Sequence, residues 1–431
     1  MTEKTIILAG GGGTRLWPLT IRVPKPVVRL GKYFIEYTID VLANAGLHDI
    51  NVAVEYEADQ IVKRLGDGSD FAYPRPLKLS YLRAPGEQEF LGTADVLRKA
   101  RDQLHDSVVV YDRQENREHE VPIGDYLAAQ ASDRYEFKRY VDHFKRIVIA
   151  SGDIIANFDI RELIEFHKKR GGIGTMALFD VKDKKKAAGF GIAKTNRHGR
   201  VLRYDEKVGD VSKVYSTDSN ASFYVFEPEI LDVIDGFDIS ELDFGKHVLP
   251  GLVGDARHEL FGLRVHGIGS GREPYFNDVG TFGNMKDTAK HLVVDGVPGV
   301  DPLSRSMMPQ MYLPRINGAH HRSIVGKDYP LDTKAYVDRC IIGNRTKVSP
   351  DSHLVDCIIY NNCKISGRGE GWIFGTNTTV EEGAKIGNNV VIAGDVVVKS
   401  SAVIDPGVKI APGNTVEGKV IHDINTSPEW A

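Results

Sequence analysis

The stretch TIILAGGGGTRLWPLT, residues 5–20, decides the fold of the first part of the chain. Thr5–Ala9 is a short apolar run that ends at glycine, which is typical of a buried parallel strand. The four glycines that follow place no Cβ in front of their N–H groups, so a phosphate chain can approach the backbone. Arg15 in the same loop can hold two phosphate oxygens at once. The stretch therefore predicts a strand followed by a phosphate-binding loop.

Outward from this stretch, strands and helices alternate up to about residue 290. The apolar spacing predicts further strands at Ile50–Val54 and Arg146–Ala150, and helices at Phe34–Asn44, Ala58–Leu65 and Ile160–Lys169. This rhythm is typical of an α/β, Rossmann-like domain with a mostly parallel sheet and helices on both faces. We expect one such domain over residues 1–293.

The last part of the chain follows a six-residue period. Apolar residues recur in one phase at Phe374, Val380, Ile386, Ile392, Val398, Ile404, Ile410 and Val416. A weaker copy runs through Tyr336, Ile342, Val348 and Leu354, and the phase slips between residues 358 and 371. The period predicts a parallel, left-handed β-helix over residues 336–431, because one inward side chain per face fills such a prism. Residues 294–335 show no period and are predicted to be a linker.

Composition narrows the class of protein. The 431 residues are 42% hydrophobic and 26% charged, with a net charge of −4, which excludes a largely disordered chain and a generally basic nucleic-acid binder. No apolar run approaches the roughly 18 residues that span a bilayer, and the N-terminus does not resemble a signal peptide. The three cysteines, Cys340, Cys357 and Cys363, suit free thiols in a reducing compartment. We therefore expect a cytoplasmic protein with no nucleic-acid or membrane partner.

A second basic group follows the glycine loop. Lys25 lies between Pro24 and Pro26, which hold its backbone stiff, and it adds a point charge for phosphate. The loop is not a Walker A loop, because no Gly-Lys-Ser/Thr follows, and it lacks the usual dinucleotide fingerprint. A plain tight turn remains an alternative for the glycines alone, but the combination with Arg15 and Lys25 is far more specific.

These residues resemble the sugar-1-phosphate nucleotidylyltransferases, whose pattern is Gly-Gly-x-Gly-Thr-Arg-Leu-x-Pro-Leu-Thr and then Pro-Lys-Pro. Residues 10–20 and 24–26 match it, and a hexapeptide β-helix is a frequent second domain of the family. The resemblance implies that Arg15 holds the β- and γ-phosphates and that Lys25 holds the α-phosphate. It also implies a nucleotide cradle formed by Gly10, Gly11, Gly13 and Thr14.

Three further segments complete the implied nucleotide and metal sites. Leu91–Ala94, with Glu87 before it, resembles the segment that lies against the base, through Gly92 and Thr93; a helix cap at Thr93 is compatible with this role and is also expected. By resemblance, Asp153 and Asp278 hold Mg²⁺. Two carboxylates offer hard oxygens to this ion, whereas a lone Asp after a strand is more often a helix cap.

The resemblance also implies a sugar-phosphate site. Gly191 matches a position where the backbone meets the sugar. Tyr204-Asp205-Glu206-Lys207 resembles Phe-x-Glu-Lys, in which Glu206 accepts bonds from sugar hydroxyls and Lys207 pairs with the sugar's phosphate. Asn220 begins a stretch that lines the same site. The alternative is a surface Glu–Lys pair beside a buried strand.

Some features depart from the family pattern. Val208 replaces a usual proline, Ser222 a frequent glycine and Tyr33 a frequent proline, which affects the sugar's identity more than the reaction. A polar insertion lies at about residues 104–145, where we expect an excursion with an amphipathic helix.

The predicted reaction joins a nucleoside triphosphate to a hexose 1-phosphate, giving a nucleotide-sugar and pyrophosphate. Trp17 resembles mannose-1-phosphate guanylyltransferases and Gly31-Lys32-Tyr33 resembles glucose-1-phosphate adenylyltransferases, so a purine nucleotide with glucose or mannose 1-phosphate is expected. One alternative is a regulatory subunit that only binds nucleotide-sugar. Another adds an acyltransferase in the β-helix, with His353 and His422 as its only candidate histidines. The β-helix favours a dimer or tetramer.

Overall fold

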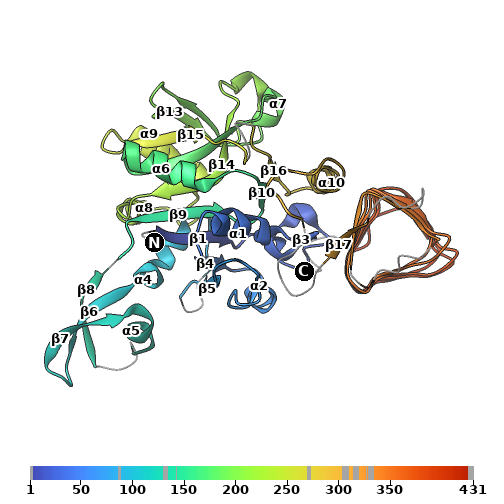
Figure 1. The fold of residues 1–431 in the computed structure, drawn as a ribbon, viewed down its shortest axis with the longest axis horizontal. Coiled ribbons are helices and arrows are strands. Elements are labelled where there is room, and N and C mark those ends of the chain that lie inside the picture. The colour runs from blue at the N-terminus through green and yellow to red at the C-terminus, as the bar shows by residue number, and fades with distance from the viewer. Residues whose placement is uncertain are drawn as a thin grey trace.

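The computed structural model describes residues 3–85, 89–129, 134–141, 143–268, 273–302, 310–313, 320–326, 328 and 334–425. An α/β domain carries a small lobe at one end and a triangular β-helix at the other (Figure 1). In the described part of the chain, no helix combines the length and apolarity that crossing a membrane requires.

The α/β domain is built on a nine-stranded mixed sheet. Its strands are β13 (Val201–Asp205), β12 (Ile192–Thr195), β14 (Asp218–Phe226), β9 (Arg146–Ser151), β1 (Glu3–Ala9), β4 (Asp49–Val54) and β5 (Lys78–Leu82) in that order, with β11 (Gly174–Asp180) beside β14 and β15 (Leu260–Arg264) beside β11. Strands β9, β1, β4 and β5 are parallel, whereas β14 runs antiparallel to β9. The carboxyl ends of β1 and β9 therefore lie side by side, where an open α/β sheet binds ligands.

Helices cover this sheet on both faces. They are α1 (Phe34–Asn44), α2 (Ala58–Leu65), α3 (Asp95–Lys99), α4 (Arg101–Leu104), α6 (Ile160–Arg170), α7 (Lys184–Ala187), α8 (Ile230–Asp235), α9 (Leu249–Gly254) and α10 (Phe282–Lys290). Short 3₁₀ and π turns are η1 (Thr14–Leu16), η2 (Lys25–Val27), η3 (Val211–Lys213), η4 (Phe244–Val248) and η5 (His291–Asp295). Two short pairings complete the domain, between β2 (Arg29–Leu30) and β3 (Lys32–Tyr33) and between β10 (Ile154–Ala156) and β16 (Phe276–Asp278).

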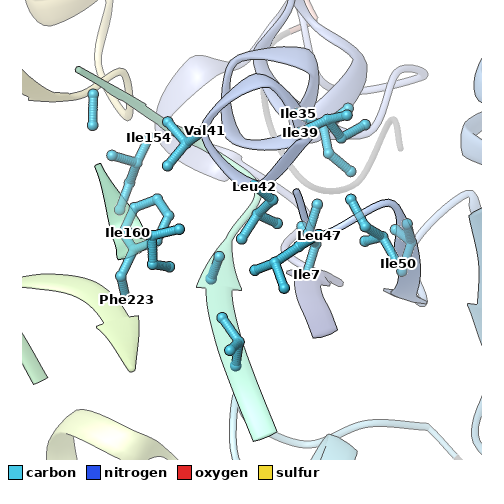
Figure 2. Close-up of a cluster of buried hydrophobic side chains, with 14 of the residues drawn as sticks. Ile7, Ile35, Ile39, Val41, Leu42, Leu47, Ile50, Ile154, Ile160 and Phe223 are labelled. Atoms are coloured by element: carbon cyan, nitrogen blue, oxygen red, sulfur yellow. The ribbon is translucent and has the colours of Figure 1, made fainter. Parts of the chain in front are cut away.

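The core beneath α1 explains why the predicted helix forms there. Ile35, Ile39 and Leu42 recur at helical spacing, and all three are fully buried. They pack with Ile7 of β1 and Ile50 of β4 in one cluster (Figure 2). Each helix and strand predicted in this domain is present, with ends that differ by at most a residue or two.

The small lobe is the polar insertion. Strands β6 (Ser107–Asp112), β7 (Arg117–Pro122) and β8 (Tyr135–Val141) form an antiparallel sheet of their own, and helix α5 (Ile123–Ala129) packs beside it. The expected helix is present, but the sheet was not predicted, because β7 and β8 are mostly exposed and lack an apolar alternation.

The β-helix stacks short strands on three faces, as in left-handed β-helices. These strands pair in parallel in the described structure, except that β17 runs antiparallel to β19. The face toward the α/β domain holds β17 (Gln310–Leu313), β19 (Ser323–Gly326), β21 (Ile341–Ile342), β24 (Ile358–Ile359), β27 (Ile373–Phe374), β30 (Val391–Ile392) and β33 (Lys409–Ile410). The second holds β22 (Lys347–Val348), β25 (Lys364–Ile365), β28 (Thr379–Val380), β31 (Val397–Val398) and β34 (Thr415–Val416). The third holds β18 (His320–His321), β20 (Tyr336–Asp338), β23 (His353–Val355), β26 (Arg368–Glu370), β29 (Lys385–Ile386), β32 (Val403–Ile404) and β35 (Lys419–Val420). The predicted fold class is confirmed.

The six-residue phase marks the inward side chains with one exception. Ile342, Phe374 and Ile392 fill equivalent places on their coils, as the period predicts. Tyr336 does not, because Val337 points inward there and Tyr336 stacks on His353 outside. Strands β18 and β19 lie within the stretch favoured as a linker and pair in register with β20 and β21.

Trp372 is a large side chain in the core of the β-helix, and we expect it to contribute strongly to stability. Trp372 is buried, donates its indole N–H to the carbonyl of Gly387 at 2.8 Å and stacks on Phe374. Replacing it with alanine should cost about 3–5 kcal/mol, because a large cavity remains among stacked coils. Urea unfolding followed by circular dichroism measures the loss, and exposed Leu202→Ala is the matched surface control. An unchanged midpoint for Trp372→Ala would contradict this packing.

Candidate active site

The glycine loop follows β1 and turns directly into η1. Gly13 has a φ of +66°, and a Cβ there would lie 2.9 Å from the Cβ of Lys25, so only glycine suits the position. Thr20 donates its hydroxyl to the carbonyl of Gly13 at 2.7 Å, which fixes the turn. Among the described residues, no atom lies within 4 Å of a Cβ built on Gly11, so the loop is open on that side.

Lys25, Asp153 and Asp278 meet beside this loop. The ammonium Nζ of Lys25 lies 2.5 Å from Oδ2 of Asp153 and 3.4 Å from Oδ1 of Asp278. Asp153 follows β9 and accepts the hydroxyl of Ser151 at 2.5 Å, while Asp278 ends β16. Three segments far apart in sequence thus bring two hard-oxygen donors to one point, which fits a divalent cation chemically.

The charges at this point stabilise one another. Burial alone would lower the pKa of Lys25, whose side chain is only 8% exposed, but Asp153 and Asp278 outweigh it and raise the pKa. Burial opposes the ionisation of Asp153, yet Lys25, the Ser151 hydroxyl and Arg15 together hold its pKa below the ordinary value. Lys25 is therefore a fixed cation and Asp153 a fixed anion at neutral pH.

Arg15 lies at the open edge of the same group. Its side chain is 64% exposed, and its Nη2 lies 3.7 Å from Oδ2 of Asp278. A Cβ on Gly280 would lie 2.6 Å from this Nη2, so glycine at that position leaves room for the guanidinium. Arg15 can therefore reach a solvent-borne phosphate while staying near Lys25.

A pocket of about 410 Å³ opens from Lys25 and Asp153 toward the segment before α3. Of the predicted nucleotide residues, Gly10, Gly11, Gly92 and Thr93 line it. Gly13 and Thr14 lie outside its lining, Gly13 backing Lys25 and Thr14 opening η1. Glu87 lies outside the described residues.

Gly92 and Thr93, which line this pocket, contact the segment Leu242–Phe244, which is distant in sequence. A Cβ on Gly92, which has a φ of +144°, would lie 2.4 Å from the carbonyl oxygen of Leu242. Thr93 donates its hydroxyl to Asp243 at 2.8 Å and accepts the N–H of Phe244 at 3.0 Å. Thr93 does not cap α3, whose N-cap is Ala94, so the expected helix cap is wrong.

The predicted sugar residues form a second group. The hydroxyl of Tyr204 donates to Oε2 of Glu206 at 2.5 Å, and Lys207 Nζ lies 3.4 Å from Oε1 of the same carboxylate. A Cβ on Gly191 would lie 2.4 Å from Oε2 of Glu206, and one on Gly245 would lie 2.5 Å from it. Lys207 is 65% exposed and free to swing toward a phosphate.

Asn220 is linked to this carboxylate through the hydroxyl of Tyr204. Its Nδ2 donates to the hydroxyls of Tyr204, at 3.2 Å, and of Tyr224, at 2.8 Å, while its Oδ1 accepts the N–H of Ser222 at 2.9 Å. Its amide hydrogens are thus used within the protein.

The two groups are joined by the segment Asp243–Gly245, which opens η4. Asp243 binds Thr93 at the nucleotide pocket, and Gly245 touches Glu206 at the sugar group. Sequence reasoning missed this segment and also Glu55, which lines the pocket at the carboxyl end of β4. The rule that ligands bind at those strand ends could have found Glu55.

A separate cluster of possible metal ligands lies on the insertion, in Asp112, Glu115 and His119, whose donor atoms lie within 4.8 Å of one another. Arg134 occupies it, with Nη2 at 2.7 Å from Asp112 and 3.9 Å from Glu115. The hydrogen bonds from Arg134 lower the pKa of Asp112 to about 2. Asp112 also accepts two backbone N–H groups of its hairpin, so we interpret this cluster as a structural clamp.

Comparison with known protein families identifies the family of this chain. The nucleotidyl transferase family profile matches residues 4–112 and 119–293, more than half of the chain. The chain therefore belongs to the nucleotidyl transferase family. The prediction of a nucleotidyltransferase is confirmed.

Its relatives include three bacterial glucose-1-phosphate adenylyltransferases. The chain is 26% identical over 455 aligned positions to that of Fervidobacterium nodosum, covering 93% of this chain and 98% of the relative. It is 28% identical to that of Clostridium novyi, covering 65% of this chain and 64% of the relative. It is 26% identical to that of Clostridium acetobutylicum, covering 68% and 69%.

Proposed function

We propose that this enzyme transfers a nucleotidyl group from a nucleoside triphosphate to a hexose 1-phosphate and releases pyrophosphate. The observation that carries the proposal is the meeting of Lys25, Asp153 and Asp278 beside the glycine loop. The pocket leads from that point to Thr93, and Asp243–Gly245 continues from Thr93 to Glu206. These contacts support a site in which the phosphates bind near Lys25 and the sugar binds near Glu206.

The chain's own residues supply alignment and charge. The phosphate oxygen of the sugar is already an anion, so it can attack the α-phosphorus in line without a general base, and pyrophosphate leaves. Lys25 is proposed to meet the α-phosphate, where charge grows in the transition state, and Arg15 the leaving phosphates. Lys207 holds the phosphate of the sugar, and Glu206 accepts bonds from its hydroxyls.

Asp153 and Asp278 are proposed to hold Mg²⁺. When bound, this ion neutralises charge on phosphate oxygens. A cation of the protein contacts the carboxylates at both places, Lys25 at this point and Arg134 on the insertion. The position of Asp153 and Asp278 beside the glycine loop, where the phosphates are proposed to bind, favours them over the insertion cluster.

The names of the relatives favour one substrate pair. Because three of them are glucose-1-phosphate adenylyltransferases, we propose ATP and glucose 1-phosphate for this chain. Assembly into a dimer or tetramer through the β-helix remains part of the proposal.

Pyrophosphate release tests the reaction. With Mg²⁺ present, ATP, GTP, UTP, CTP and dTTP are each paired with the 1-phosphates of glucose, mannose and N-acetylglucosamine. We expect release with one preferred pair, ATP with glucose 1-phosphate, and Lys25→Ala protein purified in the same way controls for contaminating activity. No release from any pair by a folded protein that binds nucleotide would instead support a regulatory subunit.

A further inference from the structure

The two oxygens of the Glu206 carboxylate have different surroundings. Its Oε2 accepts the hydroxyl of Tyr204, and both Gly191 and Gly245 approach this oxygen so closely that neither could carry a Cβ. The other oxygen, Oε1, faces Lys207, whose side chain is largely exposed. Oε2 is therefore the more enclosed oxygen, and Oε1 lies beside the exposed side chain of Lys207.

The direction of the hydrogen bonds around Tyr204 is fixed. Asn220 donates to the oxygen of Tyr204, so the single hydroxyl hydrogen of Tyr204 is available for Glu206. Asn220 is itself anchored by Ser222 and Tyr224. Burial, the neighbouring Tyr224 and Glu206 raise the pKa of Tyr204 far above its ordinary value, so the hydroxyl remains a donor. Tyr204 is 5% exposed and cannot itself reach a sugar.

A carboxylate without such a partner would behave differently. The last torsion of a glutamate is broad, so a carboxylate without a partner can present its oxygens over a range of directions. The hydroxyl of Tyr204 removes that freedom.

We propose that Tyr204 is a positioning residue that locks Glu206, so that the site offers one fixed acceptor, Oε1, to a single hydroxyl of a hexose 1-phosphate. This deepens the proposed function and rests on it. A fixed acceptor accepts a hydroxyl in one configuration and is poorly placed for its epimer, since a buried acceptor without its donor loses a charged hydrogen bond. Tyr204 thereby determines how strictly the enzyme distinguishes epimeric sugars.

The test is Tyr204→Phe, which removes only the hydroxyl. We expect kcat/KM for the preferred sugar phosphate to fall about 10-fold, mainly through the KM of the sugar. The ratio of kcat/KM between glucose 1-phosphate and its epimers, mannose 1-phosphate and galactose 1-phosphate, should fall by a similar factor. The KM of the nucleotide should stay within about twofold, because the hydroxyl of Tyr204 bonds to Glu206 and Asn220, neither of which lines the nucleotide pocket.

Tyr224→Phe is the matched control. It removes the same kind of group, but the hydroxyl of Tyr224 bonds to Asn220, whereas that of Tyr204 also bonds to Glu206. A merely structural role predicts that both variants lower the unfolding midpoint and leave the sugar ratio unchanged. In a Glu206→Gln background, Tyr204→Phe should have little further effect on the sugar ratio, as expected of a residue that acts through Glu206.

Two outcomes overturn the proposal: an unchanged sugar ratio and KM in Tyr204→Phe, or an undiminished effect of that change in the Glu206→Gln background. Wild-type pyrophosphate release, measured alongside, reports on the proposed function separately. Direct calorimetric titration of the wild type and Tyr204→Phe with glucose 1-phosphate and mannose 1-phosphate reads the same discrimination without turnover. Equal affinity ratios in the two proteins would also overturn it.

Discussion

Replacing Lys25 with alanine should lower kcat by about 10²–10³-fold while changing the KM of each substrate much less. Lys25 is buried between two prolines and held by two carboxylates, so its ammonium is in place before substrate arrives. A charge that is fixed in advance stabilises the transition state without reorganisation, and the charge at the α-phosphate grows as the reaction proceeds. The loss should therefore fall on turnover.

Lys25→Ala removes both the charge and most of the side-chain volume of Lys25, so a second variant is needed to separate the two effects. Lys25→Met keeps most of the side-chain volume, so a similar loss in both variants assigns the effect to the charge. Exposed Lys78→Ala, at the other end of the parallel strands, controls for a general change in net charge. Steady-state kinetics of pyrophosphate release measures all three, with unfolding midpoints as a check on the fold. Turnover of Lys25→Ala within threefold of the wild type would remove Lys25 from the mechanism.

The sequence predicts the position of a residue most directly when that position depends on neighbours along the chain. Gly13 and Lys25 belong to one short stretch, and a positive φ or a proline-flanked cation leaves a local signature. Asp153 follows directly from the end of a predicted strand. In each case the chemistry of the segment limits where the side chain can go.

The sequence does not predict side-chain contacts with partners that are distant along the chain. Thr93 was open to a capping role, but its hydroxyl is used by Asp243 and Phe244, across about 150 residues of chain. Asn220 stays a predicted residue of the sugar site, but the use of its amide hydrogens by two tyrosines was not predicted. Tyr336 fitted the six-residue phase, but the register of the coil turns Val337 inward. Such choices are decided by packing between segments, which no local pattern contains.

The β-helix also contributes to the site through packing. Leu16, next to Arg15, and Val28, close to Lys25, lie in the same buried cluster as Ile341 and Ile358 of the β-helix. The hydroxyl of Tyr360 donates to the carbonyl of Arg29 at 3.0 Å. The loop that carries both cations is therefore backed by a rigid stack of coils, which helps to keep Lys25 and Arg15 in place.

Replacing Asp278 with asparagine should lower activity by about 10³-fold at limiting Mg²⁺, because one of two anionic donors proposed to hold the ion is lost. Asparagine keeps the size and one oxygen but not the charge. The Mg²⁺ concentration for half-maximal activity should rise by about 10–100-fold, and higher Mg²⁺ should restore part of the rate. Metal titration of the steady-state rate, after treatment with a chelator, measures this shift.

Asp278 also faces Lys25 and Arg15, so its loss could act by misplacing those cations instead. The two explanations differ in their dependence on the ion: misplaced cations lower the rate equally at all Mg²⁺ concentrations, whereas a weakened metal site lowers it most when Mg²⁺ is scarce. Glu115→Gln, at the other cluster of possible metal ligands, is the matched control and should leave the Mg²⁺ dependence unchanged, because Arg134 already lies against those carboxylates. A shift in Glu115→Gln with none in Asp278→Asn would move the metal site to the insertion, and a uniform loss in Asp278→Asn would leave that aspartate as a support for Lys25.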